Sequence, residues 1–298
     1  MALPLTTAPR EQTRACYPED EGYVERDGVR VFYEVYGAGE PTILLLPTWS
    51  IIHSRQWKAQ IPFLARHHRV VTFDGRGNGR SDRPAEPAAY DEREFAADAL
   101  AVLDTTATEQ AVVLGYSLGA QRGLLLAAGH PGRVLGAIFV GPAYPGGGEP
   151  LPERVVPWED ELDTDAGWAK YNRHYWLRDY EGFVEFFFDR LFAEPHSTKE
   201  FEDCVGWALE TTPETLVTAQ YGATLEPEEA LDLARQVRCP VLVVHGTADR
   251  IASPSRGAAL AQHTSGSLLL VEGGGHAPHA RDPVMFNAAV REFVERLS

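Results

Sequence analysis

The chain has 298 residues, of which 43 are acidic and 27 basic, so its formal net charge is −16 at pH 7. A field of this sign repels nucleic acid and anionic membranes, and we expect neither as a partner. The proportions of hydrophobic (44%) and charged (23%) residues are those of a globular chain with enough apolar material for a core. No apolar run approaches the roughly 18 residues of a membrane span.

The three cysteines, Cys16, Cys204 and Cys239, are widely spaced and form no C-x-x-C pattern. Their number and spacing indicate neither a disulfide framework nor a zinc site. No other residues show metal-ligand spacing, so we expect no metal and no cofactor. The N-terminus lacks a basic start followed by an apolar stretch, and we therefore expect a cytoplasmic protein. We expect the protein to be a monomer or a homodimer.

The first half of the chain alternates between expected strands and expected helices. Residues 1–22 are polar and contain proline, so we expect a loosely ordered leader. Alternating apolar and polar residues on both sides of Asp27-Gly28 predict an edge hairpin. Apolar or amphipathic runs predict strands at 42–47, 70–74, 111–114 and 134–140, and helices at 54–67, 91–105 and from residue 118 onward.

The alternation stops at a segment rich in proline and glycine, residues 141–150. From about 151 to 235 the chain is rich in aromatic residues and favours helices without strands. The alternation then resumes, with strands expected at 240–245 and 267–271 and helices at 254–262 and 282–297. This order predicts an α/β fold, a mostly parallel central sheet with helices on both faces. We expect a core of residues 23–140 and 236–298, with 141–235 inserted as a helical cap.

The chemistry of the chain centres on Ser117. Gly115-Tyr-Ser-Leu-Gly119 fits the pattern G-x-S-x-G and lies between an expected buried strand and an expected apolar helix. A serine lifted out of such a turn requires a strained backbone, and side chains two residues before and after it would collide with neighbouring backbone. The N-terminus of the following helix points N–H groups at whatever the serine attacks. The pattern therefore predicts a nucleophilic serine.

A nucleophilic serine needs a histidine base and an orienting carboxylate. Active residues of an open parallel sheet gather at the carboxyl ends of strands, where the sequence places Asp249 and His276. The order Ser, Asp, His is the one associated with this kind of sheet. His279 is a rival base, but the run Gly273-Gly-Gly275 lets the backbone bend His276 over the strand end. We expect His279 at the surface or rim and His245 packed at its strand terminus.

The negative charge that develops on a substrate carbonyl oxygen requires two preorganised N–H donors. One expected donor is the amide of Leu118, the residue after the nucleophile. The other should come from the loop that follows the strand at 42–47. We expect Trp49 to supply it, with Thr48 as the second choice.

The expected cap concentrates aromatic residues between about 158 and 192. Most of them should pack the cap itself, while a subset should roof the cleft over the nucleophile and form an apolar pocket. The pocket candidates are Thr48, Tyr116, Tyr175 and Trp176. Three cations of the cap could meet a substrate carboxylate, although their default is exposure to solvent: Arg173, His174 and Arg178.

Four stretches resemble the α/β-hydrolase superfamily, in the branch that contains small esterases, epoxide-hydrolase-like proteins and C–C-bond hydrolases. They are Asp74-Gly-Arg-Gly-Asn-Gly-Arg-Ser81, Gly115-Tyr-Ser-Leu-Gly119, Gly246-Thr-Ala-Asp249 and Gly275-His-Ala-Pro278. The resemblance covers nearly everything from residue 23 onward. It implies that Ser117, Asp249 and His276 are nucleophile, orienting acid and base, and that 141–235 is the helical cap.

The chain departs from the family pattern in two places. Relatives usually carry His-Gly before the oxyanion residue, where this chain has Pro47-Thr48. Epoxide hydrolases and haloalkane dehalogenases use a nucleophilic aspartate where this chain has Ser117. An alkyl-enzyme ester formed by carboxylate attack is therefore not expected, and neither of these two activities is expected.

The sequence predicts a serine hydrolase that cleaves a small, largely apolar carboxylic ester, thioester or lactone through an acyl-enzyme on Ser117. One alternative uses the same triad to cleave a C–C bond of a β-diketone or dienone-type acid. A second alternative is a ligand-binding, receptor-like member with little turnover. The sequence does not name the substrate.

Overall fold

A computed structural model describes residues 15–297, so the first fourteen residues of the expected leader lie outside the described residues. An eight-stranded sheet runs through the molecule in the order β1-β2-β4-β3-β5-β6-β7-β8. Its strands are β1 (Asp20–Arg26), β2 (Val29–Tyr36), β3 (Thr42–Leu45), β4 (Val70–Phe73), β5 (Ala111–Tyr116), β6 (Val134–Val140), β7 (Val241–Gly246) and β8 (Ser267–Val271). Strand β2 pairs antiparallel with β1 and β4, and all other neighbours are parallel. The predicted mostly parallel α/β sheet is confirmed.

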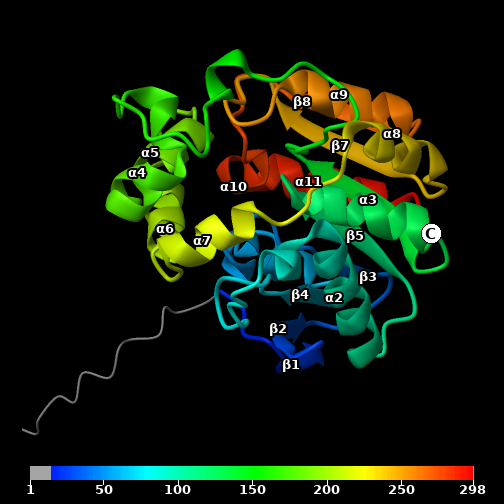
Figure 1. Cartoon of the computed structure of the whole chain (residues 1–298). Coiled ribbons are helices and arrows are strands. Elements are labelled where there is room, and N and C mark those ends of the chain that lie inside the picture. The colour runs from blue at the N-terminus through cyan, green and yellow to red at the C-terminus, as the bar shows by residue number, and fades with distance from the viewer. Residues whose placement is uncertain (1–14, 298) are drawn as a thin grey trace, which may run out of the picture.

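Helices cover both faces of the sheet (Figure 1). The helical elements outside the region between β6 and β7 are η1 (Ser54–Trp57), α1 (Ile61–Leu64), η2 (Pro87–Tyr90), α2 (Glu92–Thr105), α3 (Gly119–Gly129), α9 (Pro254–His263), α10 (Pro278–Arg281) and α11 (Pro283–Glu295). Alternate residues of one strand enter different apolar clusters. In β3, Ile43 and Leu45 join one cluster, and Leu44 joins the other. Burial on both faces explains why the central strands read as unbroken apolar runs.

Two predicted elements differ from the structure near the N-terminus. The single helix expected at 54–67 is two short pieces, η1 and α1, because Pro62 lacks an N–H donor and fits only the first turn of a helix. Strand β1 begins at Asp20, and the amide of Glu19 donates to the carbonyl of Val35 at 2.8 Å. The leader expected over 1–22 is therefore too long by at least three residues.

The chain between β6 and β7 contains helices and no strand. These elements are η3 (Pro152–Arg154), η4 (Gly167–Lys170), α4 (Arg173–Arg178), α5 (Tyr180–Leu191), α6 (Thr198–Ala208), α7 (Pro213–Gln220) and α8 (Pro227–Gln236). Helices α4 to α6 gather to one side of the sheet, whereas α8 lies beside α9 (Figure 1). Ala230 and Ala234 of α8 belong to the apolar cluster that α3 and α9 share. The cap boundary expected at residue 235 stays a prediction, and from the packing of α8 we propose that the cap ends before this helix.

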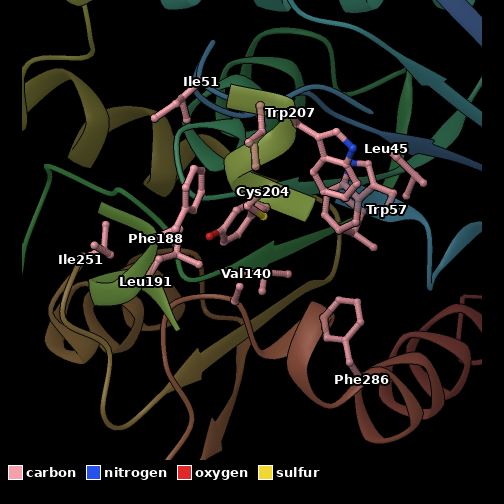
Figure 2. Close-up of a cluster of buried hydrophobic side chains, with 14 of the residues drawn as sticks. Leu45, Ile51, Trp57, Val140, Phe188, Leu191, Cys204, Trp207, Ile251 and Phe286 are labelled. Atoms are coloured by element: carbon pink, nitrogen blue, oxygen red, sulfur yellow. The ribbon is translucent and has the colours of Figure 1, made fainter. Parts of the chain in front are cut away.

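A common apolar cluster joins the helices α5 and α6 to the sheet. Figure 2 shows residues from both parts of this cluster, among them Leu45, Trp57, Val140, Phe188, Leu191, Cys204 and Trp207. Burial of apolar area contributes about 25 cal/mol per Å², so a shared cluster of this kind resists separation. The cap region is consequently packed onto the strand ends and lies close to the candidate site.

Candidate active site

Ser117 lies in the turn between β5 and α3 with a φ of 54°, in the left-handed region that non-glycine residues rarely occupy. A Cβ atom on Gly115 would lie 2.3 Å from the carbonyl oxygen of Gly119. A Cβ atom on Gly119 would lie 2.8 Å from the carbonyl oxygen of Pro47. Both approaches are closer than real Cβ contacts, which explains why the turn needs glycine on both sides of the serine.

The structure brings Ser117, His276 and Asp249 together from the ends of β5, β8 and β7. His276 Nε2 lies 3.0 Å from Ser117 Oγ, and His276 Nδ1 lies 2.7 Å from Asp249 Oδ2. The imidazole and the carboxylate are buried, whereas the serine is partly exposed. A proton on Nδ1 bonded to the carboxylate leaves Nε2 free to accept the serine proton.

The Asp249 carboxylate is held from four directions. Its Oδ1 accepts hydrogen bonds from the backbone amides of Ile251 (2.7 Å) and Ala252 (2.9 Å), while Oδ2 faces two histidines. Burial on its own would raise the pKa of this carboxyl group. The charges and hydrogen bonds of His276 and His245 outweigh burial and hold the pKa well below its ordinary value. Asp249 therefore stays ionised while it orients His276.

His245 is the second histidine on that carboxylate, a contact that the expectation of simple packing missed. Its Nε2 lies 2.9 Å from Asp249 Oδ2 and 3.1 Å from the carbonyl oxygen of Ala252. Both neighbours are acceptors, so Nε2 carries the proton. Its Nδ1 has no hydrogen-bond partner in the described chain and faces Gly257. A histidine at a strand end, four residues before the aspartate, is the sequence signal that indicates its contact with Asp249.

The loop that carries His276 is tied to α5 and its following loop. The amide of His276 donates to the carbonyl of Leu191 at 3.1 Å, and the amide of Gly275 donates to Glu194 Oε1 at 2.8 Å. Gly141 also lies against this loop, since a Cβ there would come within 2.7 Å of the His276 carbonyl oxygen. The position of His276 therefore depends on the helical region between β6 and β7 as well as on the sheet.

His279 was expected at the surface or rim, and this expectation is wrong. Its side chain is buried, with its ring centroid 4.5 Å from that of Tyr116 and 4.9 Å from that of Trp57. Burial, together with the nearby His276, lowers the pKa of His279 to about 3. The chain turns into α10 directly after Ala277, which directs His279 back into the aromatic cluster.

Ser117 opens onto a cavity of about 170 Å³. The two expected oxyanion residues, Trp49 and Leu118, line this cavity with it. Among the described residues, no hydrogen-bond acceptor takes up the backbone N–H of either one. Thr48, the second choice, does not line the cavity. This arrangement leaves both amides available for a carbonyl oxygen of a bound substrate.

A buried ion pair between Arg122 and Glu92 holds the loop just before Trp49. Arg122 Nε donates to Glu92 at 2.8 Å, and Arg122 Nη1 donates to the carbonyls of Pro47 (3.0 Å) and Thr48 (2.7 Å). In a planar trans peptide the N–H points opposite to the C=O. The Thr48 carbonyl faces Arg122, so the N–H of Trp49 points away from it. Sequence reasoning did not find this clamp, since α2, α3 and the loop at Pro47-Thr48 meet only in the folded chain.

The four expected pocket residues Thr48, Tyr116, Tyr175 and Trp176 do not line the cavity. Trp176 is fully buried and stacks on Phe183 at 4.3 Å. The Tyr175 hydroxyl donates to Asp179 within the cap, and Tyr116 lies beneath the rings of His276 and His279. Aromatic residues that do line the cavity are Trp49, Tyr90, Phe95, Tyr171 and Phe187. Tyr171 and Phe187 come from the expected aromatic segment, Tyr171 from the turn before α4 and Phe187 from α5, and the sequence alone does not single them out.

The cap cations expected as carboxylate partners also lie elsewhere. Arg173 pairs with Glu159 at 2.6 Å, and Arg178 pairs with Asp165 at 2.5 Å. Neither residue lines the cavity, which instead exposes Arg154 and Arg256. Within residues 15–297, no group of three or more potential ligands is arranged to hold a metal ion. The same part of the chain has no helix long and apolar enough to span a membrane.

A family model described as the alpha/beta hydrolase fold matches residues 41–283. The chain belongs to this family. It is 36% identical over 112 residues to a putative carbamate hydrolase RutD of Azorhizobium caulinodans, an alignment that covers 38% of this chain and 41% of that protein. RutD of Caulobacter segnis is 30% identical over 275 residues, 89% of this chain and 96% of the relative. The esterase RhEst1 from Rhodococcus sp. ECU1013 superposes with a TM-score of 0.78 at 26% identity, over 93% of this chain and 98% of that one.

The family and its relatives make this chain an enzyme with hydrolase activity. For this hydrolase we predict that His245, through Asp249, positions His276, the expected base. His245→Phe removes the Nε2 donor and should lower kcat about tenfold or more, with a smaller change in KM. His245→Gln keeps an N–H donor near the Nε2 position and should retain most of the activity. Steady-state kinetics of both variants on one ester provide the measurement, and equal losses in both would contradict the positioning role.

The buried His279 should make the hydrolase less stable in acid. Its pKa of about 3 lies below the unfolded value of about 6.5, so the unfolded chain binds the proton first as the pH falls. At about pH 4.5 this difference costs about 2 to 3 kcal/mol of the free energy of unfolding. His279→Phe keeps a ring in the cluster but cannot bind a proton. Between about pH 6.5 and 4.5, its free energy of unfolding should therefore fall less steeply than that of the wild type. Urea unfolding across that range tests it, and identical slopes would contradict the assignment.

Proposed function

We propose that this hydrolase cleaves a small, largely apolar carboxylic ester, thioester or lactone through an acyl-enzyme on Ser117. The observation that carries the proposal is the continuous chain of contacts from Ser117 Oγ through His276 to Asp249, which opens onto a cavity walled by aromatic side chains. An esterase and a carbamate hydrolase among its relatives support a reaction at a carbonyl group with a heteroatom leaving group.

In the proposed acylation step, His276 Nε2 takes the proton of Ser117 as its Oγ attacks the substrate carbonyl carbon. The carbonyl oxygen becomes an anion and accepts hydrogen bonds from the amides of Leu118 and Trp49. The imidazolium then donates its proton to the leaving oxygen or sulfur, and the bond from the carbonyl carbon to the leaving group breaks. The acyl group remains bonded to Ser117 as an ester.

Deacylation repeats these steps with water. His276 takes a proton from the water molecule, which attacks the acyl carbon, and returns it to Ser117 Oγ as the acid leaves. Asp249 remains ionised throughout because four donors surround it. Its charge stabilises the imidazolium in both halves of the reaction and fixes the required tautomer.

We propose that the helices between β6 and α8 act as a lid on this site. Tyr171 and Phe187 come from that region and line the cavity next to Ser117. The rings of Tyr171 and Phe187 also approach that of Trp49, with centroids 6.0 and 5.2 Å away. An apolar roof of this kind excludes water and strengthens the electrostatic interactions beneath it.

Ser117→Ala should abolish ester hydrolysis while the fold is preserved. We expect kcat on p-nitrophenyl esters to fall at least about a thousandfold. In a series from acetate to decanoate, the wild type should favour short acyl chains because the cavity is small. Circular dichroism of both proteins controls for folding. Turnover that survives in the variant would contradict the acyl-enzyme. A wild type without turnover of any ester would contradict the ester substrate class and favour the C–C-bond or ligand-binding alternatives.

A further inference from the structure

The wall of the cavity carries more positive than negative charge. Its arginines and its acidic residue are Arg122, Arg154, Arg256 and Glu92. Arg122 and Glu92 pair with each other at 2.8 Å and neutralise one another. Two guanidinium groups remain, in a chain whose formal net charge is −16. A cation pair in a narrow cleft attracts a negatively charged ligand against the field of the rest of the surface.

Arg256 lies in the first turn of α9, which begins at Pro254. Within the described residues its guanidinium forms no ion pair and donates no hydrogen bond. The N-terminal end of a helix carries partial positive charge, so a cation there adds to the repulsion instead of relieving it. Burial and the neighbouring charge of Arg154 lower the pKa of Arg256. Helix stability therefore does not account for an arginine at this position, whereas an anion in the cavity would.

Arg154 reaches the same cavity from η3, on the chain that leaves the sheet after β6. Its Nη1 donates to the carbonyl of Ile251, and its guanidinium carbon lies 4.8 Å from the ring centroid of Trp168 and 5.4 Å from that of Tyr171. Its Nε is buried without a hydrogen-bond partner in the described chain. No carboxylate of residues 15–297 forms an ion pair with Arg154. The rings and the carbonyl hold the side chain and leave donors unpaired, a state that costs free energy until an acceptor arrives.

We propose that Arg154 and Arg256 form a subsite for a carboxylate, and that the substrate is a short ester or lactone that carries a free carboxylate away from the scissile bond. This inference rests on the proposed function, since it places the carboxylate in the cavity that contains Ser117. Guanidinium groups bind carboxylates through paired, charge-assisted hydrogen bonds, and the two groups approach from separate elements. The aromatic wall of Trp49, Tyr171 and Phe187 then contacts the apolar carbons between the two ends.

Matched pairs of esters test the subsite. The first pair consists of the mono-p-nitrophenyl ester of adipic acid and the p-nitrophenyl ester of adipic acid monoamide. In this pair the carboxylate of the anionic member lies on the acyl side of the scissile bond. A second pair compares butyrate esters of 4-hydroxybenzoate and 4-hydroxybenzamide, which places it on the leaving side. In at least one pair the wild type should favour the anion by about tenfold or more in kcat/KM. A wild type that favours the neutral member of both pairs would overturn the proposal.

The arginine variants assign that preference to the subsite. Arg256→Gln and Arg154→Gln should each lower the ratio of anionic to neutral kcat/KM by about tenfold. Arg256→Lys should keep part of the ratio because the charge remains. Arg178→Gln removes one positive charge from the cap outside the cavity and should leave the ratio within about twofold. Equal ratios in Arg256→Gln and the wild type, or equal losses in Arg256→Gln and Arg178→Gln, would overturn the proposal.

A binding measurement separates this inference from the proposed function. If the wild type hydrolyses no ester, calorimetry of adipate with Ser117→Ala tests the subsite without turnover. Adipate should then bind Ser117→Ala at least about tenfold more tightly than it binds the Ser117→Ala/Arg256→Gln double variant. Binding that is equal in the two proteins would overturn the carboxylate subsite, whereas tighter binding with no hydrolysis would overturn only the acyl-enzyme.

Discussion

The buried carboxylate of Asp249 is the group on which the rest of the site depends. It joins the loops after β7 and β8 by accepting hydrogen bonds from two backbone amides and facing two imidazoles. A buried carboxylate with fewer partners would be protonated, and a protonated carboxyl would no longer fix His276 in the tautomer that accepts the serine proton. The shared Oδ2 atom therefore makes His245 part of the same network as the proposed base.

The second constraint is the connection between the site and the helices inserted after β6. The amide of His276 donates to the carbonyl of Leu191, the final residue of α5. Trp49, which lines the cavity, contacts the rings of Tyr171 and Phe187 from the same region. Both the proposed base and a proposed oxyanion donor thus touch the cap region. Movement of this region would change catalytic geometry as well as access, which links substrate entry to assembly of the site.

The sequence predicted the features that depend on local pattern. Apolar runs identified the buried strands, and the glycine spacing around Ser117 identified a turn whose close approaches the structure shows. The prediction of a single helix at 54–67 was wrong because the apolar pattern continues through Pro62, whereas a helix cannot continue through a proline in its interior. His279 was misplaced because a residue after a proline was taken as exposed, whereas the short helix α10 returns it to the core.

The features that sequence reasoning missed depend on how distant segments meet. Tyr171 and Phe187 line the cavity while Tyr175 and Trp176 do not. Tyr171 lies just before α4 and Phe187 lies in α5, and the rings of both pack on Trp49 from the distant loop after β3. Arg154 lies in η3, between β6 and β7, whereas Arg256 lies in α9, between β7 and β8, and the two residues share no sequence pattern. Their common position in one cavity follows from the return of the chain from the cap to β7 and α9. Such juxtapositions require the folded structure.

The acyl-enzyme on Ser117 is tested most directly by trapping it. A p-nitrophenyl ester with a bulky, slowly deacylated acyl group can be mixed with the enzyme, quenched in acid within the first turnover, and examined by intact-protein mass spectrometry with peptide mapping. We expect one acyl group per chain, on the peptide that contains Ser117, and none on Ser117→Ala. An enzyme that releases product with no added mass, or one that carries the acyl group on another residue, would contradict the central claim.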